Sequence, residues 1–375
     1  MESRTPREQS HTPSLSVIVP VRNEEQHIAD IIYQLESQSL DAAEYEILIV
    51  DGRSEDRTRE VVQALQQKYV NLRLLDNPRY LSGAARNLGV RAARGEYVLF
   101  VDGHCRILSR DMLSEVLKTF RSGKQCISRP QPQITDGVTS YQRAVSRARH
   151  SPIGHNVGSA IYTSTETECN PMSAGCGYTR ELYQRLGGVD EQFDAAEDVE
   201  FNLRVHQAGI RAYHSEQFSV GYFPRKNFLA LFRQLFRYGY GRARLARKHH
   251  GYWPLAGVLL SLFSLAFILL PFLGIFWRPF LTSWAMVSLG YALVTAIAAA
   301  LQARGEGVRM WLLIWSCFPA IHFGSGLGFL SGLVGGFSWN HAPSAGASRK
   351  RSSGGEKSST RTASFREHTG LSSGS

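Results

Sequence analysis

The sequence lacks the cysteine and glycine patterns that mark several common protein classes. Its five cysteines are odd in number and show no metal-ligand spacing, which favours free thiols in a reducing compartment over a disulfide framework or a zinc site. No G-x-G-x-x-G follows the first apolar run, Leu15–Pro20, which excludes the usual dinucleotide-binding fold. The first residues are polar without an apolar core, so we expect no signal peptide.

Acidic residues are absent from one strongly basic segment. Residues 225–250 contain eight Lys or Arg and no Asp or Glu, in a chain of net charge +10. No recognition-helix or RNA-binding signature accompanies this charge, so we expect no nucleic-acid partner. The segment directly precedes a long apolar stretch, which favours the anionic inner face of a membrane. Its residue pattern predicts a basic amphipathic helix or helix pair over 226–248, lying in the membrane interface.

Charge is absent from three long runs after this segment: Trp253–Trp277, Pro279–Ala303 and Met310–Trp339. A helix needs about 20 apolar residues to cross the hydrocarbon core, so we expect three spans in the cell membrane, with residues 1–250 cytoplasmic. Arg304 and Arg309 fit the cytoplasmic side between the second and third spans. Three spans place the basic C-terminal tail outside, against the positive-inside tendency, so a re-entrant third run is the alternative.

Composition divides the chain into five segments. Residues 1–13 are expected to be disordered, and residues 14–224 form an α/β domain. The basic interfacial segment covers 225–250, and the membrane region covers 251–340. Residues 341–375 contain fifteen Ser or Gly and are expected to be a disordered tail.

Strands and helices alternate four times in the first hundred residues. Strands are expected at 15–20, 45–50, 72–75 and 97–101, with helices over about 23–38 and 82–94. Between the second and third strands, a helix capped by Ser54 or Asp56 is expected to carry Val61, Val62 and Leu65. This alternation predicts an α/β fold with a mostly parallel, doubly wound sheet. Helices are also expected over 111–120, 179–186 and 196–205, with His206 sharing the apolar face of the last. Residues 121–178 are expected to be irregular, with only fragments of strand.

Two of the expected strands end in a carboxylate. Open α/β sheets bind ligands at the carboxyl ends of their strands. Asp102 and His104 could hold a divalent cation against a diphosphate, and an imidazole ligand favours Mn²⁺ over Mg²⁺. Asp51 could accept a hydrogen bond from a nucleobase imide. The alternatives are a helix-capping Asp with a turn His, and a simple turn former before Gly52.

Two further groups could act on an acceptor and a leaving group. Glu197 and Asp198 are adjacent acids near the start of a helix, where a carboxylate could serve as general base or simply stabilise the helix dipole. Arg237, within Gln234–Tyr238, could clamp a leaving diphosphate. By itself it also fits an interfacial arginine that contacts lipid phosphates.

These features occur together in an order that resembles the family 2 inverting glycosyltransferases, which have a GT-A fold. The resemblance covers roughly residues 14–240. The matching segments are Val17–Glu24, Ile49–Thr58, Gly83–Asn87, Val101–His104, Gly187–Glu191 and Glu197–Glu200. With the C-terminal apolar runs, the chain is most similar to the succinoglycan-type exopolysaccharide glucosyltransferases.

The resemblance implies a UDP-sugar donor lying across the strand ends. Pro20, Glu24 and Asp51 would line the uridine site with Arg86 nearby, Asp102 would coordinate the metal, and Asp198 would be the base. Gln234, Arg237 and Tyr238 match the Q-x-x-R-W motif of polysaccharide synthases, with tyrosine replacing tryptophan. The family's usual D-x-D has become Asp102-Gly103-His104, and its usual D-D-G-S has become Asp51-Gly52-Arg53-Ser54.

Three functions are therefore compared. The first is a membrane-bound enzyme that transfers one sugar, glucose, from a UDP-sugar to a polyprenyl-diphosphate-linked acceptor in exopolysaccharide synthesis. The second is a processive polysaccharide synthase, favoured by the Gln234–Tyr238 motif and disfavoured by only three candidate spans. The third is a catalytically silent membrane scaffold that binds nucleotide-sugar, which the retention of Asp102 and Asp198 disfavours.

Overall fold

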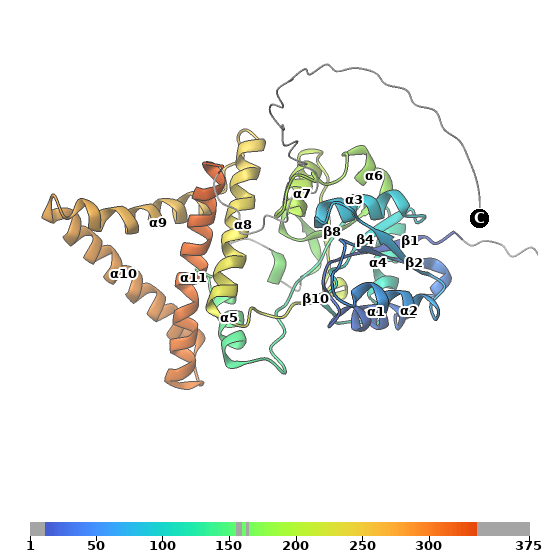
Figure 1. Ribbon diagram of the computed structural model, residues 1–375, viewed down its shortest axis with the longest axis horizontal. Coiled ribbons are helices and arrows are strands. Elements are labelled where there is room, and N and C mark those ends of the chain that lie inside the picture. Colours follow the sequence, from blue (N-terminus) through green and yellow to red (C-terminus); the bar gives the residue numbers. More distant parts are fainter. Residues whose placement is uncertain (1–11, 155–159, 163–164, 336–375) are drawn as a thin grey trace, which may run out of the picture. The chain divides into compact units, whose positions relative to one another are not determined.

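The computed structural model describes residues 12–154, 160–162 and 165–335, so the proposed disordered tail at 341–375 and nearly all of the N-terminal segment lie outside the described residues. Ten strands are present in this described part (Figure 1). They are β1 (Leu15–Val21), β2 (Tyr45–Asp51), β3 (Leu72–Asp76), β4 (Tyr97–Phe100), β5 (Arg106–Ile107), β6 (Cys126–Ser128), β7 (Thr167–Cys169), β8 (Gly175–Thr179), β9 (Ala212–His214) and β10 (Val220–Gly221).

Eight strands form one sheet in the order β3-β2-β1-β4-β8-β6-β9-β7, and β10 pairs with β5 in a separate ribbon. Strands β3, β2, β1 and β4 are mutually parallel, which confirms the predicted parallel sheet. Strand β8 is antiparallel to both of its neighbours, and β7 is antiparallel to β9. The sheet is therefore mixed beyond β4, in the region where the sequence predicted only fragments.

Helices cover both faces of the sheet. They are α1 (Ile28–Glu36), α2 (Thr58–Gln66), α3 (Ser82–Ala92), α4 (Met112–Arg121), α5 (Ser140–His150), α6 (Arg180–Arg185) and α7 (Glu197–Gln207). Alternate strand residues such as Val17 and Ile47 face α1, α2 and α4. Their neighbours Ile18 and Leu48 face α3, α6 and α7. Because side chains alternate across a strand, both sets are apolar and the central strands are buried on both faces.

Three local expectations differ from the structure. The helix expected from Asn23 begins at Ile28, because the backbone N–H groups of residues 23–25 instead bond the side chains of Ser54, Asp56 and Thr58. The prediction for His206 was wrong, since its side chain is exposed near the end of α7. Helix α5 was missed because its apolar face consists of small residues, Ala144 and Ala148 with Val145.

Four long helices complete the described chain: α8 (Phe228–Lys248), α9 (Leu255–Leu273), α10 (Arg278–Gln302) and α11 (Gly307–Leu333). The last three are long and apolar enough to cross a membrane. The basic segment forms one continuous helix, α8, rather than a pair. Its apolar side chains Leu231 and Leu235 pack against α11 and α5, so this part of its apolar face is covered by protein and is not available to lipid.

Candidate active site

The loops after β1 and β2 form one side of the candidate site. Asp51 ends β2, and its side chain is completely buried. Its carboxylate accepts hydrogen bonds from the backbone N–H of Ser54 and from the Ser54 hydroxyl, at 2.5 Å for the latter. Arg59 from α2 donates to the same carboxylate at 2.7 Å and to Asp76 at 2.9 Å. The negative charge of Asp51 is therefore neutralised within the protein.

The carboxylate that follows β4 is more open. Asp102 keeps 34% of its side chain exposed and accepts a short hydrogen bond from the Tyr222 hydroxyl. Burial opposes its charge, but the Arg86 guanidinium at 3.7 Å and the Tyr222 bond outweigh that effect and lower the pKa of Asp102. Two residues on, Nδ1 of His104 lies 3.0 Å from Glu24, and this hydrogen bond raises the pKa of His104.

Arg86 connects this carboxylate with the pair of acids at the start of α7. Its guanidinium donates to Glu197 at 2.9 Å and lies 3.7 Å from Asp102. The resemblance implied that Arg86 lies near the uridine site, and the structure shows that it lies between Asp102 and Glu197. Burial raises the pKa of Glu197, the charge of Asp198 acts in the same direction, and Arg86 opposes both. One cation thus holds the two acidic groups at the same edge of the sheet.

Asp198 itself remains exposed. It occupies the first turn of α7, two residues after Ala196, which has a left-handed backbone with φ of 64°. Such a conformation costs a non-glycine residue roughly 1–2 kcal/mol. Helix α8 presses on this turn, since a side chain at Gly241 would collide with Ala195 and Ala196. The turn that presents Asp198 is thus held by α8 as well as by its own helix.

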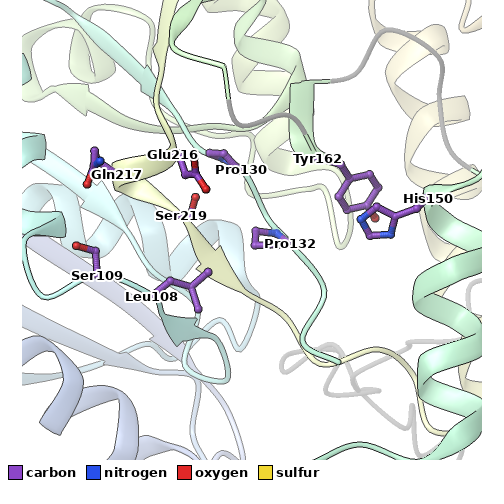
Figure 2. Close-up of a pocket in the computed structure, with 9 residues that line it drawn as sticks. All are labelled: Leu108, Ser109, Pro130, Pro132, His150, Tyr162, Glu216, Gln217 and Ser219. Carbon is purple, nitrogen blue, oxygen red and sulfur yellow. The ribbon is translucent and has the colours of Figure 1, made fainter. Parts of the chain in front are cut away.

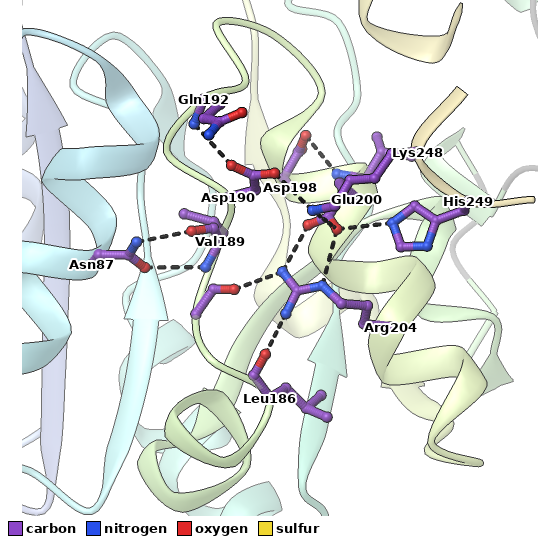
Figure 3. A network of polar contacts seen from close by, with 12 residues as sticks. Asn87, Leu186, Val189, Asp190, Gln192, Asp198, Glu200, Arg204, Lys248 and His249 are labelled. Carbon is purple, nitrogen blue, oxygen red and sulfur yellow. Dashed lines mark hydrogen bonds and ion pairs between the residues drawn. The ribbon is translucent and has the colours of Figure 1, made fainter. Parts of the chain in front are cut away.

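A network of polar contacts fixes the loop before this turn (Figure 3). The side-chain amide of Asn87 donates to the Val189 carbonyl at 2.8 Å, and its oxygen accepts the Val189 N–H at 3.1 Å. On the other side, Glu200 is completely buried and accepts hydrogen bonds from Arg204, Lys248 and His249 at 2.7–3.0 Å. Burial opposes the charge of Glu200, but these donors outweigh it and lower its pKa.

The Gln234–Tyr238 motif lies on α8. Arg237 donates to the backbone carbonyl of Asp194 at 2.9 Å, two residues before Ala196. Gln234 donates to the Tyr238 hydroxyl at 3.0 Å, and Tyr238 is 43% exposed. The structure therefore brings Arg237 to the loop that leads into Asp198.

Two residues near Asp102 were missed from the sequence. Tyr222 follows β10 and donates to Asp102. Arg129 follows β6 and is 3% exposed, and its Nε and Nη1 atoms have no hydrogen-bond partner in the described structure. Burial lowers the pKa of the Arg129 guanidinium, but Cys176, Tyr222, Cys105 and the charge of Asp102 outweigh this effect and raise the pKa. Their signals were weak: Arg129 falls in the stretch that received only fragments of strand, and Tyr222 has no motif around it.

A cavity of about 460 Å³ adjoins this region (Figure 2). Pro130, next to Arg129, and Ser219, next to β10, line it together with the rings of His150 and Tyr162, which stack with centroids 4.5 Å apart. None of the predicted site residues lines this cavity. It is therefore a neighbour of the candidate site and not the place where the predicted chemistry residues converge.

The residues present fit a metal that takes most of its ligands from a substrate. The described residues contain no cluster of three or more His, Cys, Asp or Glu side chains suited to a metal ion. Asp102 nevertheless offers a charged, partly exposed carboxylate. His104 uses Nδ1 toward Glu24, which leaves Nε2 as its ligating atom. One or two protein ligands, with phosphate oxygens completing the shell, suit Mg²⁺ or Mn²⁺.

Comparison with known proteins supports the resemblance to the family 2 glycosyltransferases. A family model described as glycosyl transferase family 2 matches residues 16–185. Succinoglycan biosynthesis protein ExoA of Rhizobium meliloti (strain 1021) is 31% identical over 251 residues, which cover 64% of this chain and 72% of that protein. A dolichyl N-acetyl-alpha-D-glucosaminyl phosphate 3-beta-D-2,3-diacetamido-2,3-dideoxy-beta-D-glucuronosyltransferase of Methanococcus voltae is 26% identical over 264 residues, covering 68% of this chain and 78% of that protein.

A solved structure has the same fold. The mannosyltransferase PcManGT from Pyrobaculum calidifontis, in complex with GDP-Man and Mn²⁺, superposes with a TM-score of 0.51 at 20% identity, covering 85% of this chain and 87% of that one. The α/β domain is a GT-A domain followed by long C-terminal helices. The chain belongs to glycosyltransferase family 2, and it is a glycosyltransferase.

Proposed function

We propose that this protein transfers one sugar, glucose, from a UDP-sugar to a lipid-linked oligosaccharide at the cytoplasmic face of the cell membrane, in exopolysaccharide synthesis. The observation that carries the proposal is the bridge made by Arg86. It joins Asp102, at the end of β4, to the Glu197–Asp198 pair at the start of α7. A donor diphosphate at Asp102 and an acceptor hydroxyl at Asp198 would thus meet at one edge of the sheet.

The proposed reaction is a single displacement. The acceptor hydroxyl oxygen attacks the anomeric carbon and forms the new glycosidic bond, while the bond from that carbon to the diphosphate oxygen breaks. The bond electrons leave with UDP, the hydroxyl proton passes to the carboxylate of Asp198, and the configuration at the anomeric carbon inverts. A positioned carboxylate base typically contributes about 10²–10⁴-fold in rate.

Pro20, Glu24 and Asp51 are proposed to line the uridine site. Asp51 would accept a hydrogen bond from the base imide once the Ser54 hydroxyl, which now occupies Oδ1, turns away.

The donor diphosphate is proposed to lie at Asp102. Asp102 and His104 would hold Mg²⁺ or Mn²⁺, which supplies positive charge to the diphosphate when bound. Arg129 would contribute a second cation on the protein side, because its buried guanidinium has donors without partners. Arg237, with Gln234 and Tyr238, would stabilise the leaving group or the acceptor from α8.

Two observations support a lipid-linked acceptor at a membrane. The three apolar helices are long enough to reach into a bilayer, and they follow directly on the basic helix α8. The Methanococcus voltae relative is named for a dolichyl phosphate substrate, and ExoA is named for the biosynthesis of an exopolysaccharide.

The test is UDP release by membranes that contain the protein, with a panel of UDP-sugars and Mn²⁺, with and without a lipid extract. We expect release that depends on UDP-glucose and on the lipid. Asp198→Asn should keep UDP binding and lose transfer. Asp30→Asn is the matched control, because Asp30 is also an exposed acid in the first turn of a helix, α1. No release from any UDP-sugar, or normal turnover by Asp198→Asn, would contradict the proposal.

The same assay addresses the processive alternative, which the Gln234–Tyr238 motif favours. A processive synthase would form long polymer without added lipid. A single-transfer enzyme should give a product larger than its acceptor by one hexose, measured by mass spectrometry.

A further inference from the structure

The three apolar helices differ sharply in what covers them. In their most apolar windows, 17% of α9 and 11% of α10 is buried, against 56% of α11. From Cys317 to Leu333, α11 has no exposed residue. A helix that is surrounded by lipid leaves most of its side chains free of protein contact, so α11 is in a different environment from α9 and α10.

The catalytic domain covers the first half of α11. Ala144, Val145 and Ala148 of α5 share a buried cluster with Ile314 and Phe318. Near the middle of α11, Nε2 of His322 lies 2.8 Å from the backbone carbonyl of Ile153. Arg147 of α5 also donates to the Gln302 carbonyl at 2.7 Å, at the end of α10. The start and middle of α11 therefore lie against the domain that contains the active site.

Helix α8 covers the second half of α11, and the two helices lie side by side (Figure 1). Gly324, Gly328 and Gly332 are spaced one turn apart, and a side chain on each would collide with the backbone carbonyls of Phe232, Phe236 and Tyr240 in turn. The residue numbers increase in the same direction along both helices, so α8 and α11 run parallel. Small residues at this spacing allow two helix backbones to approach closely.

Helix α8 is unsuited to hydrocarbon. It carries six basic residues: Arg233, Arg237, Arg242, Arg244, Arg247 and Lys248. A Lys or Arg at the centre of a membrane helix costs roughly 2.5–3.5 kcal/mol. Three of them also bind the catalytic domain: Arg237 at the Asp194 carbonyl, Arg244 at the Gln192 carbonyl and Lys248 at Glu200. If α11 crossed the bilayer, it would draw these charges and the loop around Ile153 into the membrane.

Helices α9 and α10 have the opposite character. They meet at a turn where a side chain on Gly274 would touch Leu281, and the exposed fractions of Phe276 and Trp277 at this turn are 88% and 61%. By a rise of 1.5 Å per residue, 19 and 25 residues extend about 28 and 37 Å, close to the roughly 30 Å of a bilayer core.

The other end of this hairpin rests on α11. Trp311 of α11 donates to the Ala296 carbonyl at 2.9 Å, and Ser261 donates to the Gly326 carbonyl at 3.1 Å. The rings of Phe263, Phe267 and Tyr291 also pack against Phe323 of α11. Contact with α11 therefore extends from the base of the hairpin to about the middle of α9 and α10, while the outward-facing apolar side chains and the tip are exposed in the described structure.

We propose that α9 and α10 are the two membrane spans of this chain, and that α11 is a strut on the catalytic side of the bilayer which holds the hairpin to α5 and α8. Val334 then lies on the same side as the active site. This inference rests on the membrane attachment contained in the proposed function.

The experiment is side-specific cysteine labelling of the full chain in membrane vesicles of both orientations, with a membrane-impermeant maleimide. Cys169→Ser provides the background, because the other four cysteines are buried. Single cysteines replace three exposed apolar residues: Val70 in the catalytic domain (99% exposed), Phe276 at the hairpin tip (88%) and Val334 after α11 (83%). Val308→Cys at the start of α11 should label with Val70→Cys under either topology, and it is the control for folding of this region.

We expect Val334→Cys and Val70→Cys to label from the same side and Phe276→Cys from the opposite side. A three-span chain would instead label Val334→Cys from the side opposite Val70→Cys, and that result would overturn the proposal. So would a Phe276→Cys variant that labels with Val70→Cys or from neither side. Extraction of the wild type by alkaline carbonate would show that the chain is not membrane-inserted, which is a failure of the proposed membrane attachment and distinct from an incorrect topology.

Discussion

Two strand ends that look alike in the sequence have different environments in the structure. Strand β2 ends at Asp51 and is followed by Gly52, and Asp102 and Gly103 come after β4. Asp51 is completely buried, Arg59 neutralises its charge and Ser54 donates hydrogen bonds to it. Asp102 remains 34% exposed, and its nearest cation is 3.7 Å away.

The difference shows that an Asp-Gly pair at a strand end can either stabilise the fold, as at Asp51, or stay available for a ligand, as at Asp102. Breaking the Asp51 contacts removes charge-assisted hydrogen bonds from a buried site, which costs stability. The Asp102 carboxylate has capacity left for a ligand, so its loss should affect activity first. The following predictions test this division, from the largest expected effect to the smallest.

The largest effect is expected for Asp102→Asn. A neutral amide loses the charge that would hold a divalent cation at the diphosphate, so we expect turnover to fall by at least about 100-fold with little change in the unfolding temperature. UDP release and thermal unfolding in detergent would measure both. Asp136→Asn, at an exposed turn, is the control and should remain active. Equal metal-dependent UDP binding by Asp102→Asn and wild type would remove Asp102 from the metal site.

A third acid, Glu200, extends the comparison to a buried carboxylate with three hydrogen-bond donors, of which Arg204 and Lys248 are cations. Glu200→Gln should lower the free energy of unfolding by about 3 kcal/mol, because it leaves buried donors without their charge partner.

The stability difference between wild type and Glu200→Gln should depend on pH. The pKa of Glu200 is lowered from its usual 4.5 in the folded protein. Its contribution is therefore fully present above about pH 4.5 and is lost as the pH falls through the lower folded value. Chemical unfolding between pH 3 and pH 7 would follow this loss. A difference that does not change over this range would show that the charge of Glu200 is not what stabilises the loop.

Asp51→Asn should lower the free energy of unfolding by about 2 kcal/mol, since it weakens the hydrogen bonds from Arg59 and Ser54. Turnover at saturating donor should change little, and the donor KM should rise. Arg59→Gln removes the cation from the same pair, so the double variant should be less destabilised than the sum of the two single variants. Additive losses would mean that the pair at Asp51 is not coupled.

The smallest effect is expected for Tyr222→Phe. The variant keeps the ring and removes the hydroxyl that donates to Asp102. We expect about a tenfold fall in kcat/KM for the donor, which corresponds to roughly 1.4 kcal/mol. The matched control is Tyr213→Phe, whose hydroxyl contacts Glu166 on the surface instead. Full activity in Tyr222→Phe would show that Tyr222 does not orient Asp102.

Much of the first half of the domain could be predicted from local sequence. The runs that form β1, β2 and β4 are largely apolar on both faces, and turn residues separate them from amphipathic helices, so the parallel sheet and the places of Asp51 and Asp102 follow. Asp198 could be placed near a helix start because an adjacent pair of acids precedes an apolar pattern. These signals lie within a few residues of the feature they predict.

The partners of these residues depend on contacts far apart in the chain. Tyr222 reaches Asp102 across 120 positions, and Arg86 reaches Glu197 across 111. Neither pairing has a local signal, because it depends on how β10 and α3 are placed by the rest of the sheet. Arg129, whose Nε and Nη1 atoms have no hydrogen-bond partner in the described structure, was missed because it falls in the stretch where only fragments of strand were expected.

The sequence by itself determined the α/β order of the first hundred residues, the carboxylates at the strand ends and the presence of three apolar helices. Only the tertiary structure decided which carboxylate is neutralised and which stays open. It also decided that α11 is covered by α5 and α8 while most of the surface of α9 and α10 stays exposed. The physical reason is that hydropathy records how much apolar surface a segment must remove from water, whereas long-range packing decides whether protein or lipid covers that surface.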